Sequence, residues 1–152
     1  MDAIEFLNKE RRKARAALGR VVQAAADERG ELWEELEPEL AAHEKLEDEC
    51  LYAPLADDEA WMRDPRAVDW RQRHHDGVNA IEGLIDEIDD LDPEDASWLT
   101  KVKGVQTCLE KHIEEEEQEI FARISKVWPA SRSRRAGAEM QEMKDRNAGR
   151  KS

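Results

Sequence analysis

Four long stretches of this 152-residue chain carry an apolar residue at every third or fourth position. This spacing brings the apolar residues onto one face of a helix, so each stretch predicts an amphipathic helix with a buried side. No strand-like alternation of useful length and no repeat of solenoid period interrupts the pattern. We therefore predict an all-α fold, an up-and-down antiparallel four-helix bundle, from stretches that run approximately over residues 2–27, 31–55, 66–88 and 95–128.

Proline and capping residues set the expected limits of these helices. Pro38 lies inside the second stretch and predicts a kink or a break after Leu36. A looser segment, residues 56–65, is expected to connect the second helix to the third. An Asp or Ser between Asp95 and Trp98 is placed to cap the fourth helix, which we expect to end at Trp128 and Pro129.

The last part of the chain has a different composition. The run Ser131–Arg135 is rich in arginine and is interpreted as a solvated linker, followed by a short helix over residues 136–146 and a frayed tail. The expected organisation is therefore a bundle over residues 1–129. A basic linker, a short C-terminal helix and a tail would occupy residues 130–152.

Charge and cysteine content exclude several classes of function. The chain has 24 basic and 37 acidic residues and a net charge of −13, which disfavours nucleic acid or an anionic membrane as its main partner. It has no apolar run of about 20 residues and no signal-peptide pattern, so we expect a cytoplasmic protein. Cys50 and Cys108 stand alone, which indicates neither a disulfide scaffold nor a zinc ribbon.

Histidine and glutamate replace apolar residues inside three of the four stripes. His43 and Glu47 lie four residues apart on the second helix, and His112 and Glu116 repeat the spacing on the fourth. A separation of four residues is a rise of about 6 Å, so both side chains can reach one metal ion or a close pair of ions. His74 falls in the matching stripe of the third helix. Imidazole and carboxylate together suit iron, manganese or zinc.

A simpler interpretation is that each His–Glu pair is a polar contact between helices. One pair alone would favour it, but two pairs and a third histidine at similar depth favour a metal site, because an unpaired buried charge is costly. Glu44 is expected to be exposed, although it could turn inward as an extra oxygen ligand. The choice of His74 over the neighbouring His75 depends on the phase of the third helix.

At this point the chain resembles the hemerythrin-like, or HHE cation-binding, family. The two HxxxE motifs are specific in combination, and they differ from the ExxH spacing of ferritin-like di-iron proteins. The resemblance covers about residues 3–144, and it is carried by Ile4–Arg11, Leu40–Glu47, Leu51–Pro54, His74-His75 and His112–Glu117.

The resemblance implies a bundle whose four helices each offer a histidine and whose HxxxE glutamates bridge two irons. Members of the family bind oxygen reversibly, sense iron, oxygen or nitric oxide, handle iron or react with peroxide. Carried over by position, the implied metal ligands are His43, Glu47, His74, His112 and Glu116. The implied cofactor is non-haem iron, and the implied partner is oxygen or another small diatomic molecule or oxidant. No protein partner is indicated.

The chain departs from the family at two positions. Arg11 stands where the first helix should present its histidine, and Lys111 stands before His112, where close relatives often have a second histidine. Arginine is permanently cationic and repels a neighbouring metal ion. Three arrangements follow from Arg11. One ion is held by His74, His112 and the two glutamates; or Arg11 replaces the metal and pairs with Glu47 or Glu116; or Arg11 swings outward.

The leading hypothesis from the sequence is a non-enzymatic carrier or sensor with one or two irons, which binds oxygen or a related small oxidant at an open position on iron. An enzymatic role at the same iron has no independent acid, base or nucleophile to support it. The rival hypothesis is a metal-free bundle that acts as an interaction or stress-response scaffold. Arg11 favours the rival, and the two intact HxxxE motifs favour metal.

Overall fold

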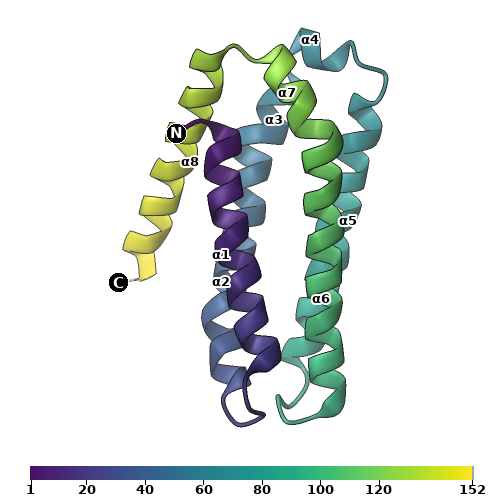
Figure 1. Cartoon of the computed structure of the whole chain (residues 1–152), viewed down its shortest axis with the longest axis vertical. Helices are drawn as coiled ribbons and strands as arrows, with labels where there is room; N and C mark the ends of the chain where they lie inside the picture. The colour runs from purple at the N-terminus through teal and green to yellow at the C-terminus, as the bar shows by residue number, and fades with distance from the viewer. Residues whose placement is uncertain (152) are drawn as a thin grey trace.

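The computed structural model describes residues 1–151, with side chains through residue 148. Four long helices run up and down beside one another: α1 (Ala3–Gln23), α2 (Arg29–Glu47), α5 (Ala67–Asp89) and α6 (Ala96–Glu115). Figure 1 shows α1 and α2 as one antiparallel pair and α5 and α6 as the other. Residues 1–151 contain no strand. The predicted all-α, up-and-down antiparallel bundle is confirmed.

Two of the long helices continue through a π-helical turn into shorter segments. The turn η1 (Asp48–Tyr52) links α2 to α3 (Ala53–Ala56), and η2 (Glu116–Ile120) links α6 to α7 (Phe121–Val127). A further short helix, α4 (Glu59–Met62), lies in the connection to α5 that we predicted to be loose. Asp58 caps its start, and the Asp58 side chain accepts a hydrogen bond from the backbone N–H of Trp61 at 3.0 Å.

The helix starts agree with the capping residues in the sequence. Asp95 caps α6 by accepting a hydrogen bond from the backbone N–H of Ser97 at 2.8 Å, as predicted. Of the kink or break predicted after Leu36, the break does not occur, because α2 is continuous across Pro38. Proline removes a single intrahelical hydrogen bond, and the buried side chains on both sides of it, Leu36 and Leu40, hold the helix against its neighbours.

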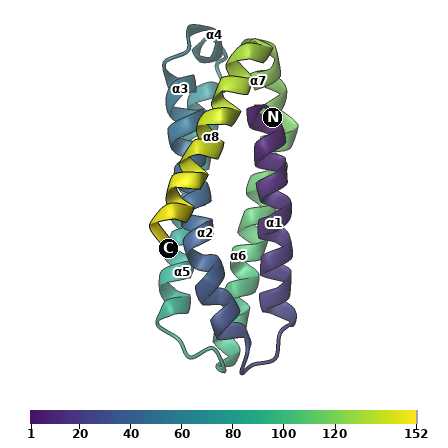
Figure 2. The ribbon, with the colours of Figure 1, turned by 90° about the vertical axis from the view of Figure 1, so that its left-hand side faces the viewer.

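The C-terminal helix is longer than the sequence predicts. Helix α8 (Ala130–Lys151) begins directly after Pro129 and includes the arginine-rich run, which is therefore not a linker. Arginine is a good helix former, and proline suits the start of a helix. Figure 2 shows α8 outside the four long helices, crossing the side of the molecule. Ser152, at the end of the expected frayed tail, lies outside the described residues.

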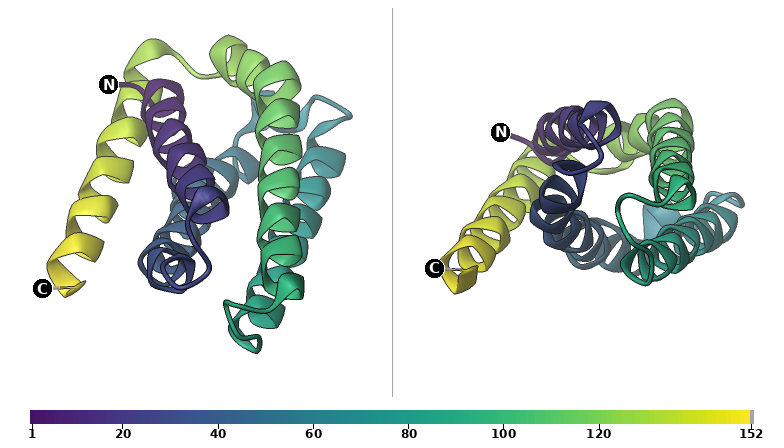
Figure 3. Two further views of the ribbon diagram at one scale, coloured as in Figure 1. Left: turned by 60° about the horizontal axis from the view of Figure 1, so that its bottom comes forward. Right: turned by 90° about the horizontal axis from the view of Figure 1, so that it is seen from below.

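The apolar core consists of two clusters separated along the bundle axis. The upper cluster joins α1, η1, α5, α7 and α8 through residues such as Leu7, Tyr52 and Met140. The lower cluster joins the other halves of the long helices through residues such as Leu18 and Trp98. Seen from below, the four long helices surround a common centre (Figure 3). Within the described residues, no helix is both long and apolar enough to cross a membrane.

Candidate metal centre

A layer of polar side chains separates the two apolar clusters. On each long helix these side chains lie between a residue of one cluster and a residue of the other, as Arg11 does between Leu7 and Leu18. Arg11, Glu47, His74 and Glu116 are buried in this layer, and His43 and His112 are partly exposed. The polar residues that meet there are Arg11 from α1, His43 and Glu47 from α2, His74 from α5, His112 from α6 and Glu116 from η2.

Glu47 lies at the centre of the layer and is 1% exposed. Its Oε1 is 3.1 Å from Nε2 of His43, and its Oε2 is 3.2 Å from Nε2 of His112. Burial favours the neutral acid, but the two histidines outweigh burial and hold the pKa of Glu47 well below its usual range. The same contacts raise the pKa of His43 despite its burial. Glu47 is therefore an ionised carboxylate enclosed by imidazoles.

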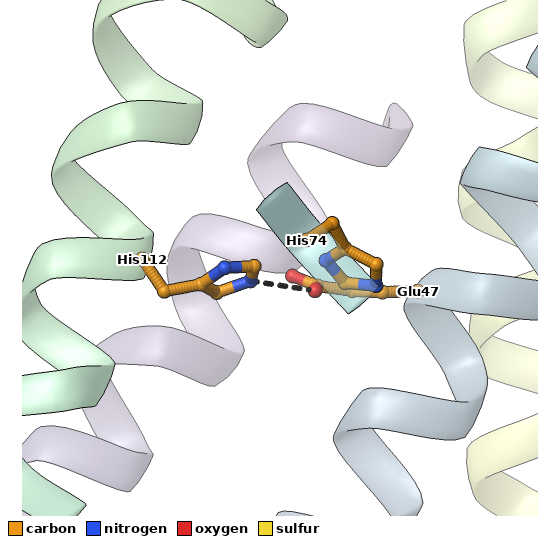
Figure 4. A group of neighbouring side chains, drawn as sticks. All are labelled: Glu47, His74 and His112. Carbon is orange, nitrogen blue, oxygen red and sulfur yellow. Dashed lines mark hydrogen bonds and ion pairs between the residues drawn. The ribbon is translucent and has the colours of Figure 1, made fainter. Parts of the chain in front are cut away.

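Three side chains from three different helices converge here. One ligand atom from each of Glu47, His74 and His112 lies within 4.8 Å of the other two. Figure 4 shows the three side chains pointing toward one another from α2, α5 and α6. Glu47 and His112 are within hydrogen-bonding distance of each other, and all three ligand atoms are close enough together to surround one ion.

His74 has the features of a neutral ligand histidine. Burial lowers its pKa, so the imidazole is neutral at neutral pH and one ring nitrogen keeps a free lone pair. Its Nδ1 is buried and has no hydrogen-bond partner among the described residues. The ring is held by stacking on Tyr52, with centroids 3.9 Å apart, and by a tilted contact with the His112 ring at 5.0 Å. A buried ring nitrogen without a partner is costly unless a ligand satisfies it.

His112 joins the two carboxylates. Besides its contact with Glu47, its Nε2 lies 2.6 Å from Oε1 of Glu116. Glu116 Oε1 nevertheless receives no aligned hydrogen bond. Burial alone would lower the pKa of His112, but Glu116 and Glu47 outweigh burial and raise it to about 11. Without a metal, this imidazole is therefore protonated and supplies one positive charge to the layer.

Arg11 supplies the second positive charge. Its Nη2 is 2.8 Å from Oε1 of Glu116 and 3.9 Å from Oε1 of Glu47, and the side chain is 2% exposed. Its Nη1 is 3.6 Å from the half-exposed Glu117, and its guanidinium carbon lies 4.4 Å from the centre of the Phe121 ring. Arg11 has not swung out to solvent. It lies against the Glu116 side of the layer.

Tyr52 belongs to the site, although the sequence did not single it out as a site residue. Its hydroxyl is buried and donates a 3.0 Å hydrogen bond to Oε2 of Glu116. Burial and the nearby carboxylate raise the pKa of Tyr52 well above its usual value, so the hydroxyl keeps its proton. Tyr52 follows Glu47 by five residues, and the π-helical turn η1 widens the helix there. A sequence pattern with the 3.6-residue period of an α-helix does not place Tyr52 on the same face as Glu47.

Two neighbours of the site were left open by the sequence. His75 is exposed and His74 is buried, so α5 has the phase that turns His74 inward. Glu44 is half-buried and lines an internal cavity of about 20 Å³ with Arg11, His43, Glu47 and other residues. Burial and then the nearby Glu82 raise the pKa of Glu44 to about 7. Glu44 thus lies at the edge of the layer, beside the predicted ligands.

The structure brings together all five residues predicted from the two HxxxE motifs and the third stripe, although in different settings. Glu47, His74 and His112 form the group with suitable mutual distances. His43 contacts this group through Glu47, and Glu116 is shared between Arg11, His112 and Tyr52. Two imidazoles and one carboxylate are donors that suit a divalent transition metal, and the unpartnered Nδ1 of His74 fits such an ion.

Comparison with known proteins agrees with this architecture. The hemerythrin HHE cation binding domain matches residues 2–124. The crystal structure of a hemerythrin HHE cation binding domain-containing protein from Mycobacterium kansasii has the same fold, with a TM-score of 0.79 and 19% sequence identity, over 95% of this chain and 86% of that one. A search of curated proteins finds no match. By its sequence match over most of its length, the chain belongs to the hemerythrin HHE cation binding domain family.

Proposed function

We propose that this protein binds a single non-haem iron ion through Glu47, His74 and His112, and that it binds or senses dioxygen or a related small oxidant. Two histidines and one carboxylate are the donor set of mononuclear non-haem iron(II) sites that keep open positions. Iron(II) with an open position supplies affinity for dioxygen and similar oxidants. The observation that carries the proposal is the buried, unpartnered Nδ1 of His74 beside Glu47 and His112.

Arg11 supports one ion rather than two. The buried carboxylates of Glu47 and Glu116 carry two negative charges, and the guanidinium of Arg11 already balances one of them. A second divalent ion beside this fixed positive charge would add strong repulsion in a region with little water. One divalent ion that displaces the proton of His112 changes the charge of the layer by only one unit. We propose that Arg11 takes the place of the second ion.

The remaining residues position the ligands in this proposal. His43 forms a hydrogen bond with Oε1 of Glu47, and Oε2 of Glu47 faces His112. Tyr52 supports the site twice, because its ring stacks on His74 and its hydroxyl binds Glu116. Hydrogen bonds of this kind fix the orientation of ligand side chains and raise metal affinity.

A metal-free scaffold is the second candidate, and one observation favours it. Arg11 and a protonated His112 already neutralise Glu47 and Glu116, so the layer is balanced without any ion. Under this alternative the unpartnered Nδ1 of His74 would simply be an unsatisfied atom. The two candidates therefore differ in the role of His74.

The test is a comparison of His74→Ala with His75→Ala in anaerobic titrations with iron(II), and with cobalt(II) as a spectroscopic probe. We expect His74→Ala to weaken binding by about 100-fold or more, since loss of even a residue that only hydrogen-bonds a ligand costs about 10–100-fold. The exposed neighbour His75 should be replaceable without effect. A folded wild-type protein that binds neither ion would support the scaffold, and equal affinity in the two variants would contradict the role of His74 as a ligand.

A further inference from the structure

A cleft of about 350 Å³ lies between α1, α2 and α8, on the side of the bundle where His43 is found. Its floor is largely apolar and includes Leu36, Leu40 and Leu46. Glu10, Lys13, Glu39 and Lys144 line it as well and supply its charged groups. The cleft is separate from the Glu47, His74 and His112 group, and the proposed function does not use it.

The cleft and the metal centre share a wall. Ala14, Leu40 and His43 line the cleft, and the same three residues line the internal cavity of about 20 Å³ beside Glu47 and His112. The side chain of His43 is 15% exposed, whereas that of Glu47 directly behind it is 1% exposed. His43 and two small or apolar neighbours thus separate the outer cleft from the inner cavity.

Helix α8 forms one wall of the cleft, and its two halves are held to the rest of the protein in different ways. The first half of α8 is anchored, since Ala136 and Met140 are completely buried and the backbone at Gly137 lies close to the first residues of the chain. Residues 141–148 contain no buried side chain. In that half, Lys144 Nζ pairs with Glu10 Oε1 on α1 at 2.6 Å. This ion pair and the partly buried Met143, which packs against the upper apolar cluster, hold the outer half of α8 over the cleft.

We propose that this cleft is the port through which small uncharged molecules reach the metal centre, with His43 at its inner end and the Lys144–Glu10 ion pair as a latch on α8. The apolar floor disfavours hydrated ions. The inner cavity has room for about one water-sized molecule, which limits what passes to the size of dioxygen or hydrogen peroxide. The role as a port rests on the proposed function, but its geometry can be tested without metal.

A second groove offers a less suitable route. It has a volume of about 490 Å³ and reaches Tyr52 and His74 beside α4 and α5. The cavity behind it is about 10 Å³, at the lower limit for one water molecule, and the stacked rings of Tyr52 and His74 lie between them.

The port can be tested by carbethoxylation of His43 with diethyl pyrocarbonate in the metal-free protein, followed by peptide mass spectrometry. Opening the latch with Lys144→Gln should accelerate modification of His43 about twofold to fivefold, the effect expected for loss of one partly exposed ion pair. The matched control is Arg146→Gln, which removes the same charge from the same helix but breaks only a contact with Glu142 inside α8. Modification of the exposed His75 provides the internal reference.

Narrowing the passage should have the opposite effect. Ala14→Leu places a larger side chain at the wall that the cleft and the cavity share, and Ala42→Leu does so on the cleft side alone. Both variants should slow modification of His43 in protein whose helix content by circular dichroism is unchanged. Equal rates in Lys144→Gln and Arg146→Gln, or no slowing in the folded leucine variants, would overturn the port. Neither result depends on whether iron binds.

Discussion

Among single residues, Arg11 has the largest influence on the character of the metal centre. A buried arginine with two buried carboxylates forms a closed ionic group, and removal of one member of such a group leaves an uncompensated charge. Arg11 also keeps all three of its nitrogens without an aligned hydrogen bond. Its contribution is therefore chiefly charge, and its guanidinium lies over the Phe121 ring.

Another residue, Glu37, is expected to make the free energy of unfolding depend on pH. Burial and the neighbouring carboxyl group of Asp89 raise its pKa from 4.5 to about 7. Between these values the folded chain holds a proton that the unfolded chain releases, so the free energy of unfolding should fall as pH rises through this window. Glu37→Gln removes the ionisation and should reduce the difference in urea midpoint between about pH 5 and about pH 7.5.

The matched control for Glu37 is Glu35→Gln, an exposed position on the same helix. It removes the same charge, so it should shift the urea midpoints without changing their dependence on pH. If Glu37→Gln retains the full pH dependence of the wild type, the cause of that dependence lies elsewhere.

Among the elements, the two π-helical turns have the most direct effect on the site. Each starts at the glutamate of an HxxxE motif or directly after it: η1 starts one residue after Glu47, and η2 starts at Glu116 itself. A π turn places residues five apart on the same face, and such turns are frequent at functional sites. In η1 the result is that Tyr52 reaches back to the layer and binds Glu116.

Helix α8 depends on one close backbone approach. A Cβ built at Gly137 would lie 2.3 Å from the backbone oxygen of Met1 and 2.8 Å from the backbone carbon of Asp2. We therefore expect Gly137→Ala to destabilise the protein by about 1–3 kcal/mol, the usual cost of overpacking, even though alanine favours helices. Urea unfolding followed by circular dichroism measures this change.

Gly83 provides the control for Gly137. It lies in the exposed middle of α5, and a Cβ there would meet nothing within 4 Å. Gly83→Ala should therefore stabilise the protein by about 0.5–1 kcal/mol through helix propensity alone. If Gly137→Ala were stabilising to the same extent, the N-terminus would have to move aside freely, and the anchor of α8 would be weaker than the structure indicates.

At the scale of the whole molecule, the bundle could be predicted from the sequence. Apolar residues recur with the same helical spacing in all four long stretches. The sequence also predicted His43, Glu47, His74, His112 and Glu116, because polar residues inside an apolar stripe are easy to identify. The metal-ligand roles of these five residues stay a prediction. Tyr52 was missed because its alignment depends on a π turn, and the start of α8 was missed because an arginine-rich run does not show whether it is helical.

The whole bundle also explains how an ionic layer can persist in its middle. The layer lies between two apolar clusters that are anchored at opposite ends, and contacts such as the perpendicular pair Trp33–Trp98 at 6.2 Å fix the lower end. Tyr52 and Phe121 belong to the upper cluster and also touch the layer. The distances between the four long helices at the site are thus set by apolar packing, and the polar side chains adapt to them.

The most direct test of the central claim is the iron content per chain after anaerobic loading with iron(II) and removal of excess metal, measured by elemental analysis for the wild type and Arg11→His together. A single ion held by Glu47, His74 and His112 predicts about one iron in the wild type, and more than one when a ligand replaces the guanidinium. About two irons in the wild type would show that Arg11 does not take the place of an ion. No iron in folded protein of either form would contradict the metal centre itself.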